Sequence, residues 1–274
     1  MRNRIILMIL ILICIFSAGC GLPQPANSVD AFSDPASVST PSTAVSAPSP
    51  AVEESVSSEP VNSFSEFLSA DDSQPVTIES YLQEKQAWSD GKANIHLQDE
   101  VGAYFVFNLP CSQEEYLALK QGQKLRIRGY KTDFSGQIQI TDAVYSVLDG
   151  MYVAEPEDIS DFTNTDDLYL RQNRRVSFHA MTVEPMFDGV SAFYRGWDNS
   201  GSTAKGSDLY FTASNGGESF TFLVKTQLCG NDSDVYRTVQ NLHVGDVVNL
   251  EGILCWYNGP QPLLTSISIL SGSK

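Results

Sequence analysis

Aromatic side chains beside predicted turns are the residues of this 274-residue chain whose chemistry is most informative. An exposed ring can stack on a base, a sugar or a peptide side chain, and stacking on one base contributes about 1–3 kcal/mol. For any single ring, packing at the end of a core or between domains is the favoured interpretation. The prediction of a binding surface therefore rests on the group. Its members are Trp88, Phe134, Phe193, Tyr194, Trp197, Trp256 and Tyr257.

Catalytic and metal-binding constellations are not evident. The sequence has no GxSxG, HExxH, P-loop or GxGxxG motif, and His96, His179 and His243 each stand alone. The segment 198–201 (DNSG) offers oxygen ligands but lacks the spacing and the terminal Glu of an EF-hand calcium loop. We therefore expect no catalytic residues, no metal and no cofactor, and a protein that is not an enzyme.

Two stretches, 119–140 and 242–263, are copies of one pattern. The glycines at 122, 129 and 136 recur at 245, 252 and 259, an offset of 123 residues in each case. Each stretch reads as a strand, a tight turn and a second strand. The chain is therefore predicted to contain a duplicated unit.

Each copy is predicted to contain five strands and one short helix. In the first copy, strands near 76–88, 93–99 and 103–109 precede the repeated hairpin, and Ser112 with Glu115 forms a capping box that begins the helix. In the second copy, strands near 174–181, 208–212 and 220–224 lead to a helix after Ser233. The order in both is three strands, a helix and two strands.

This order resembles the OB-fold, a five-stranded Greek-key barrel with its helix between strands three and four. The stretch LQDEVGAYFVF and the pattern LxxGxxLxIxG are similar to parts of bacterial OB modules. The resemblance implies a mostly β protein with two tandem OB-like five-stranded barrels, at 75–150 and 168–274, joined by a linker at 151–167. It carries no catalytic residues with it.

The loops after strands one and four flank the ligand face of OB-folds. The resemblance therefore implies that Trp88 and Phe134 converge at one end of the first barrel. In the second copy the same loops hold the other five aromatic candidates, and the first of these loops is enlarged by an insertion at 185–206.

The first 20 residues have the features of an export signal. Arg2 and Arg4 precede an apolar run at 5–16, and small residues at 17–19 precede Cys20. This ending resembles the bacterial lipobox, which implies a lipid on Cys20 and an anchor on the outer face of the bacterial cell membrane; ordinary signal cleavage is the alternative. Residues 21–74, rich in Ser, Pro and Ala, are predicted to be a disordered tether.

The chain is strongly acidic, with a formal net charge of −16. Such a charge disfavours nucleic acid and favours cationic partners, although solubility alone is the simpler explanation. One modest basic cluster, Lys120, Lys124, Arg126, Arg128 and Lys131, departs from this pattern.

Three cysteines, Cys111, Cys229 and Cys255, fall in the predicted barrels. Cys111 and Cys229 occupy equivalent places in the two copies, which favours two copies of one structural position over disulfide partners.

Together these features predict a non-catalytic, extracellular lipoprotein. Its tandem OB-like domains are expected to bind a protein, peptide or glycan, and the whole is similar to poorly characterised lipoproteins of Gram-positive bacteria. The alternative is a lipoprotein that binds single-stranded nucleic acid, as many OB-folds do.

Overall fold

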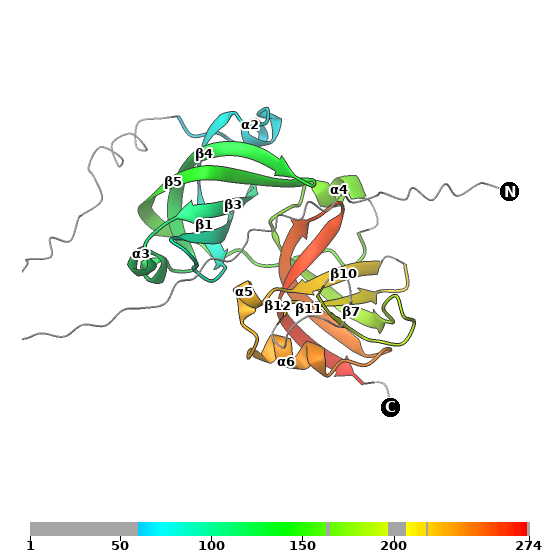
Figure 1. The fold of residues 1–274 in the computed structure, drawn as a ribbon. Helices are drawn as coiled ribbons and strands as arrows, with labels where there is room; N and C mark the ends of the chain where they lie inside the picture. The colour runs from blue at the N-terminus through cyan, green and yellow to red at the C-terminus, as the bar shows by residue number, and fades with distance from the viewer. Residues whose placement is uncertain (1–59, 163–164, 197–206, 218, 273–274) are drawn as a thin grey trace, which may run out of the picture. The chain divides into compact units, whose positions relative to one another are not determined.

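The structure is a computed structural model that describes residues 60–162, 165–196, 207–217 and 219–272. It is mostly β and contains two closed five-stranded barrels, both within one compact unit of the chain. Figure 1 draws the first barrel in cyan to green and the second in yellow-green to red. Within these described ranges, no helix is both long enough and apolar enough to cross a membrane.

Barrel 1 closes in the strand order β1-β2-β3-β5-β4. Its strands are β1 (Pro75–Lys85), β2 (Lys92–Gln98), β3 (Ala103–Pro110), β4 (Gln123–Phe134) and β5 (Gln137–Met151). The pairing of β3 with β5 is parallel, and the other pairings are antiparallel. Branched side chains alternate inward along these strands, and Ile78, Ile95, Val106 and Ile127 are fully buried in the core.

Helix α3 (Gln113–Ala118) lies between β3 and β4, as the sequence predicts. Its capping box is formed: the Ser112 hydroxyl accepts from the Glu115 backbone N–H at 3.2 Å, and the Glu115 carboxylate accepts from the Ser112 backbone N–H at 2.7 Å. The end of the helix is stabilised by Lys85, whose ammonium donates to the carbonyls of Tyr116 and Leu119.

The residues just before barrel 1 are folded, so the predicted tether extends too far along the chain. Helix α2 (Phe64–Ser69) falls inside the range 21–74 that the sequence assigns to a disordered tether. A capping box between Ser63 and Glu66 begins the helix, and Phe67, only 1% exposed, packs edge-on against Tyr104 with the ring centroids 5.0 Å apart. The aromatic side chains supply the apolar area that the Ser/Pro-rich stretch lacks, so this segment folds with barrel 1.

Barrel 2 repeats the topology of barrel 1. Its strands are β7 (Arg175–Glu184), β9 (Leu209–Ser214), β10 (Ser219–Val224), β11 (Val247–Trp256) and β12 (Pro260–Ser271). They run in the order β7-β11-β12-β10-β9, and a β7–β9 pairing closes the ring. The pairing of β10 with β12 is parallel, like that of β3 with β5. The sequence prediction of two tandem OB-like barrels is therefore confirmed.

Short elements surround barrel 2. They are β6 (Glu157–Asp158), α4 (Thr165–Tyr169), β8 (Tyr194–Arg195), α5 (Thr226–Cys229) and α6 (Asp234–Gln240). Two of them lie partly or wholly in the predicted linker at 151–167: β6 pairs with β7, and α4 begins at Thr165. Ile159 is fully buried in the core of barrel 2, so this connection belongs to the folded part.

One pair of the repeated glycines, Gly129 and Gly252, has a common physical cause. Where β4 crosses β5, the register shifts between Arg128 and Tyr130, and a Cβ on Gly129 would lie 2.7 Å from the Thr141 carbonyl oxygen. At the equivalent crossing of β11 and β12, a Cβ on Gly252 would collide with the Leu263 carbonyl. Each bulge brings two backbones into close approach, and only glycine leaves room for it.

Candidate ligand-binding surfaces

The outer side of β2 and β3, where OB-folds commonly bind ligands, is buried in barrel 1. His96 is 0% exposed, Gln98 is 5% exposed and Phe105 is 9% exposed. Their neighbours on the same strands, Ile95 and Leu97 on β2 and Val106 on β3, already fill the barrel core. These three side chains therefore point outward and are covered from outside. We call this surface the covered face.

Barrel 2 covers this face. The Arg175 backbone N–H donates to the Gln98 side-chain oxygen at 2.7 Å, and the Arg174 guanidinium donates to the Val101 carbonyl. At the loop between β1 and β2, the Ala87 backbone N–H donates to the Gln227 carbonyl in α5. The usual ligand face of barrel 1 is therefore occupied by the second copy of the same fold.

His96 is the titratable group at the centre of the covered face. Its ring stacks on Phe105 with the centroids 4.7 Å apart, and its Nε2 lies 3.3 Å from Gln86 Nε2. Nδ1 is buried without a hydrogen-bond partner among the described residues. Burial, and secondarily the positive charge of Lys225, lowers the pKa of His96 to about 3. The ring is therefore neutral at physiological pH.

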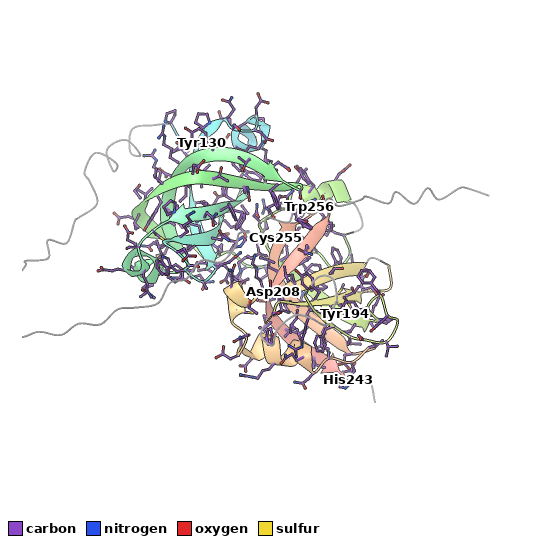
Figure 2. The ribbon with its side chains drawn as sticks, in the orientation of Figure 1. Tyr130, Tyr194, Asp208, His243, Cys255 and Trp256 are labelled. Carbon is purple, nitrogen blue, oxygen red and sulfur yellow. The ribbon has the colours of Figure 1, made fainter. Side chains whose placement is uncertain are left out.

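The two repeated hairpins contact each other. Gln137, at the start of β5, accepts a hydrogen bond from the Trp256 backbone N–H at 2.8 Å and donates to the Asn173 side chain at 2.8 Å. The Asn258 backbone N–H donates to the Ser135 carbonyl at 2.8 Å. Figure 2 labels Trp256, which lies on the β11–β12 hairpin. These contacts hold the loops after strand four of both barrels against each other.

Four of the seven aromatic candidates serve packing. Trp88 donates from Nε1 to the Cys111 carbonyl at 2.9 Å and packs on the core of barrel 1. Tyr194 is 4% exposed, Trp256 is 9% exposed, and Phe193 packs against the core of barrel 2. Packing, which the sequence analysis favours for any single ring, describes the position of all four.

Two of the other three candidates are exposed. Phe134 is 60% exposed and Tyr257 is 55% exposed, and their rings, one from each barrel, lie 6.3 Å apart. Trp88 and Phe134, expected at one end of barrel 1, take part in separate contacts. Trp197 lies outside the described residues, as does Cys20.

Sequence reasoning missed two exposed apolar side chains in the insertion after β7. Phe187 is 92% exposed and Val190 is 79% exposed. Asp188 orders this loop by accepting from the backbone N–H groups of Val190 and Ser191 at 2.9 and 2.8 Å. The hydrogen bond from the Ser191 hydroxyl, followed by these two backbone hydrogen bonds, lowers the pKa of Asp188 to about 2. In the sequence, only the insertion itself points to these two side chains, because the type of a residue does not show whether its side chain is exposed.

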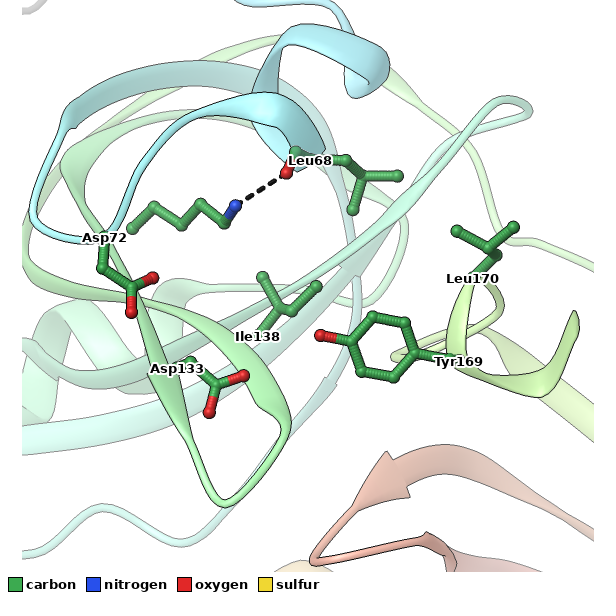
Figure 3. Close-up of a pocket in the computed structure, with 7 residues that line it drawn as sticks. Leu68, Asp72, Asp133, Ile138, Tyr169 and Leu170 are labelled. Carbon is green, nitrogen blue, oxygen red and sulfur yellow. Dashed lines mark hydrogen bonds between the residues drawn. The ribbon is translucent and has the colours of Figure 1, made fainter. Parts of the chain in front are cut away.

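A pocket of about 470 Å³ lies at the end of barrel 1, beside α2 and α4 (Figure 3). It is lined by Leu68, Asp72, Lys131, Asp133, Ile138, Tyr169 and Leu170. The Lys131 ammonium donates to the carbonyls of Leu68 and Ala70 at 2.7 and 2.6 Å. The sequence did not reveal this pocket, because its residues come from the predicted tether, the first barrel and the predicted second domain.

Metal-binding and disulfide chemistry are not evident in the described ranges. They contain no group of three or more His, Cys, Asp or Glu side chains placed to hold a metal ion. Cys111, Cys229 and Cys255 are free thiols, and burial raises the pKa of each.

Comparison with known proteins gives structural likenesses alone. No protein-family model matches the chain, and no curated protein does.

The fold defines this chain as a tandem OB-like barrel protein. The features that define it are the strand order, the parallel β3–β5 and β10–β12 pairs and the position of α3.

Three solved structures illustrate the likeness. A murine DNA-binding protein bound to double-stranded DNA has 11% identity and a TM-score of 0.34, covering 72% of this chain and 97% of that one. The Ifi202 HINa domain in complex with 20-bp double-stranded DNA has 15% identity and a TM-score of 0.30, covering 72% and 95%. A replication protein A heterotrimer bound to single-stranded DNA has 13% identity and a TM-score of 0.29, covering 74% and 49%.

Proposed function

We propose that this is a non-catalytic binding protein, carried on the outer face of the bacterial cell membrane by a lipid on Cys20, whose tandem OB-like domains bind a protein, peptide or glycan. The observation that carries the proposal is the covered face of barrel 1. Its side chains His96, Gln98 and Phe105 are buried under barrel 2. A long nucleic-acid strand therefore lacks its usual track on this barrel, whereas a ligand that uses loops or a pocket does not need that track.

The basic side chains of barrel 1 support the same proposal. Glu79 holds two members of the basic cluster, with Lys124 Nζ 2.7 Å and Arg126 Nε 3.4 Å from its carboxylate oxygens. Lys131 is bound to backbone carbonyls. Binding of single-stranded nucleic acid without sequence preference needs a groove of available cations, and these cations are already engaged in contacts within the protein. Other engaged arginines are Arg171, Arg174 and Arg175.

Binding to oligonucleotides separates this proposal from the nucleic-acid alternative. In fluorescence anisotropy titrations at about 150 mM salt, we expect labelled single-stranded 20-mers and a 20-bp duplex to bind no more tightly than the non-specific range of about 10⁻⁴–10⁻⁶ M. Glu79→Gln is a useful comparison, because it releases Lys124 and Arg126 and should strengthen any residual binding. Submicromolar binding by the native chain, weakening steeply between about 50 and 200 mM salt, would establish the nucleic-acid alternative instead.

The anchor is proposed from the leader sequence, since residues 1–59 lie outside the described ranges. Arg2, Arg4 and the apolar run before Cys20 motivate it. Cells that express the native chain or Cys20→Ala and are fed radioactive palmitate provide the test. We expect label on the native chain alone, and label on both chains would contradict lipidation at Cys20.

A further inference from the structure

The pocket at the end of barrel 1 has an apolar wall and an acidic rim. Leu68 from α2, Ile138 from β5 and Leu170 after α4 supply the wall, together with the ring of Tyr169. Figure 3 shows the carboxylates of Asp72 and Asp133 beside this space, with the Tyr169 hydroxyl directed toward Ile138. The volume of about 470 Å³ lies within the range of about 300–1,000 Å³ typical of sites for small ligands.

The two carboxylates are available to a ligand. Both side chains are exposed, and no cation among the described residues lies within ion-pair distance of either. Asp133 accepts the Gly136 backbone N–H at 2.9 Å through Oδ1, which leaves Oδ2 open. Lys131 is 8% exposed, and its ammonium is held by the Leu68 and Ala70 carbonyls. The lysine therefore supports the α2 end of the pocket, while both aspartates line it with exposed side chains.

The field of these carboxylates also acts on the aromatic wall. Burial, followed by the negative charges of Asp133 and Asp72, raises the pKa of Tyr169 above its ordinary value. The same negative potential favours a positive group in the space between them. An anionic ligand, such as a phosphate or a carboxylate, is disfavoured here by the same field.

We propose that this pocket binds the side chain of a lysine or arginine presented by a protein or peptide partner. The aliphatic stem lies along Leu68, Ile138 and Leu170, and the charged head lies between Asp72 and Asp133. Long basic side chains combine an apolar stem with a cationic tip, which matches this division of the pocket. The inference rests on the proposed binding function and gives it a partner class, consistent with the acidic character of the chain.

Methyl NMR on the full chain in detergent solution tests the proposal at the site itself. The probes are Nα-acetyl-lysine methylamide and, as an uncharged match, Nα-acetyl-norleucine methylamide. We expect saturable shifts of the Ile138 and Leu170 methyl signals with the lysine probe, at an affinity about five-fold or more above that of the norleucine probe, because only the lysine probe can pair with the carboxylates.

Variants separate the specific site from general attraction to an acidic protein. Asp72→Asn and Asp133→Asn should each weaken binding of the lysine probe about three-fold or more. Asp149→Asn, which makes the same change of charge on β5 eleven residues from Ile138, should leave binding unchanged. Equal binding of the norleucine probe, or equal weakening by all three variants, would overturn the inference. Either result leaves the binding function to be judged by the oligonucleotide titrations.

Discussion

Trp256→Ala is expected to lower the free energy of unfolding by about 3–5 kcal/mol, the usual cost of truncating a buried large aromatic side chain. Trp256 is 9% exposed, belongs to the core of barrel 2, and meets the ring of Tyr169 edge-on with the centroids 5.2 Å apart. It also lies directly against Gly136 of barrel 1, where an added Cβ would be 2.6 Å from the indole Cδ1. The loss therefore combines a cavity in one barrel with a weakened contact to the other.

The neighbouring Tyr257→Ala provides a matched control. Tyr257 is 55% exposed and lies beside Phe134 at a centroid distance of 6.3 Å. Surface substitutions of this kind usually change stability by less than about 0.5 kcal/mol, and loss of the aromatic pair adds about 0.5–1.5 kcal/mol. Urea unfolding followed by far-UV circular dichroism measures both variants. Equal costs for the two, or a stable Trp256→Ala chain, would show that Trp256 is not a core residue.

The sequence was sufficient to predict the barrels because their determinants are local. Gly129 and Gly252 mark the same close approach of backbones in each copy, and Ser112 with Glu115 marks the start of α3. Inward alternation of branched residues, such as Ile95 and Leu97 on β2, identifies the core side of each strand. Such signals depend on neighbours in the chain, and the chain shows them directly.

The candidate site could be predicted only in part, because its determinants are not local. His96 alternates outward on β2, and its burial follows only from the placement of barrel 2 over it. Asp72 and Tyr169 meet at one pocket although about a hundred residues separate them. The composition of the Ser/Pro-rich stretch does not indicate helix α2, because Phe64 and Phe67 are a small minority of its residues. Contacts between the barrels depend on how the barrels are placed in three dimensions, and the alternation of residue types along the sequence does not specify that placement.

Acidification is expected to destabilise the protein through His96. Its ordinary pKa of about 6.5 is lowered to about 3 by burial and by Lys225, so the folded state favours the neutral ring. Below pH 6.5 the unfolded chain takes up a proton at this site while the folded chain does not. This contribution to stability is therefore complete above pH 6.5 and is lost as the pH falls toward 3, at up to about 1.4 kcal/mol per pH unit.

His96→Gln isolates this contribution, because glutamine does not titrate. Urea unfolding at pH 7, 5 and 4 measures the difference in unfolding free energy between the native chain and the variant, and the acidic residues common to both cancel. We expect the difference to shift in favour of the variant as the pH falls. Protonated His96 would face Lys225 of barrel 2 across the covered face, so the same titration should loosen the contact between the barrels. A difference that stays constant with pH would mean that His96 is reached by solvent and that the covered face is open.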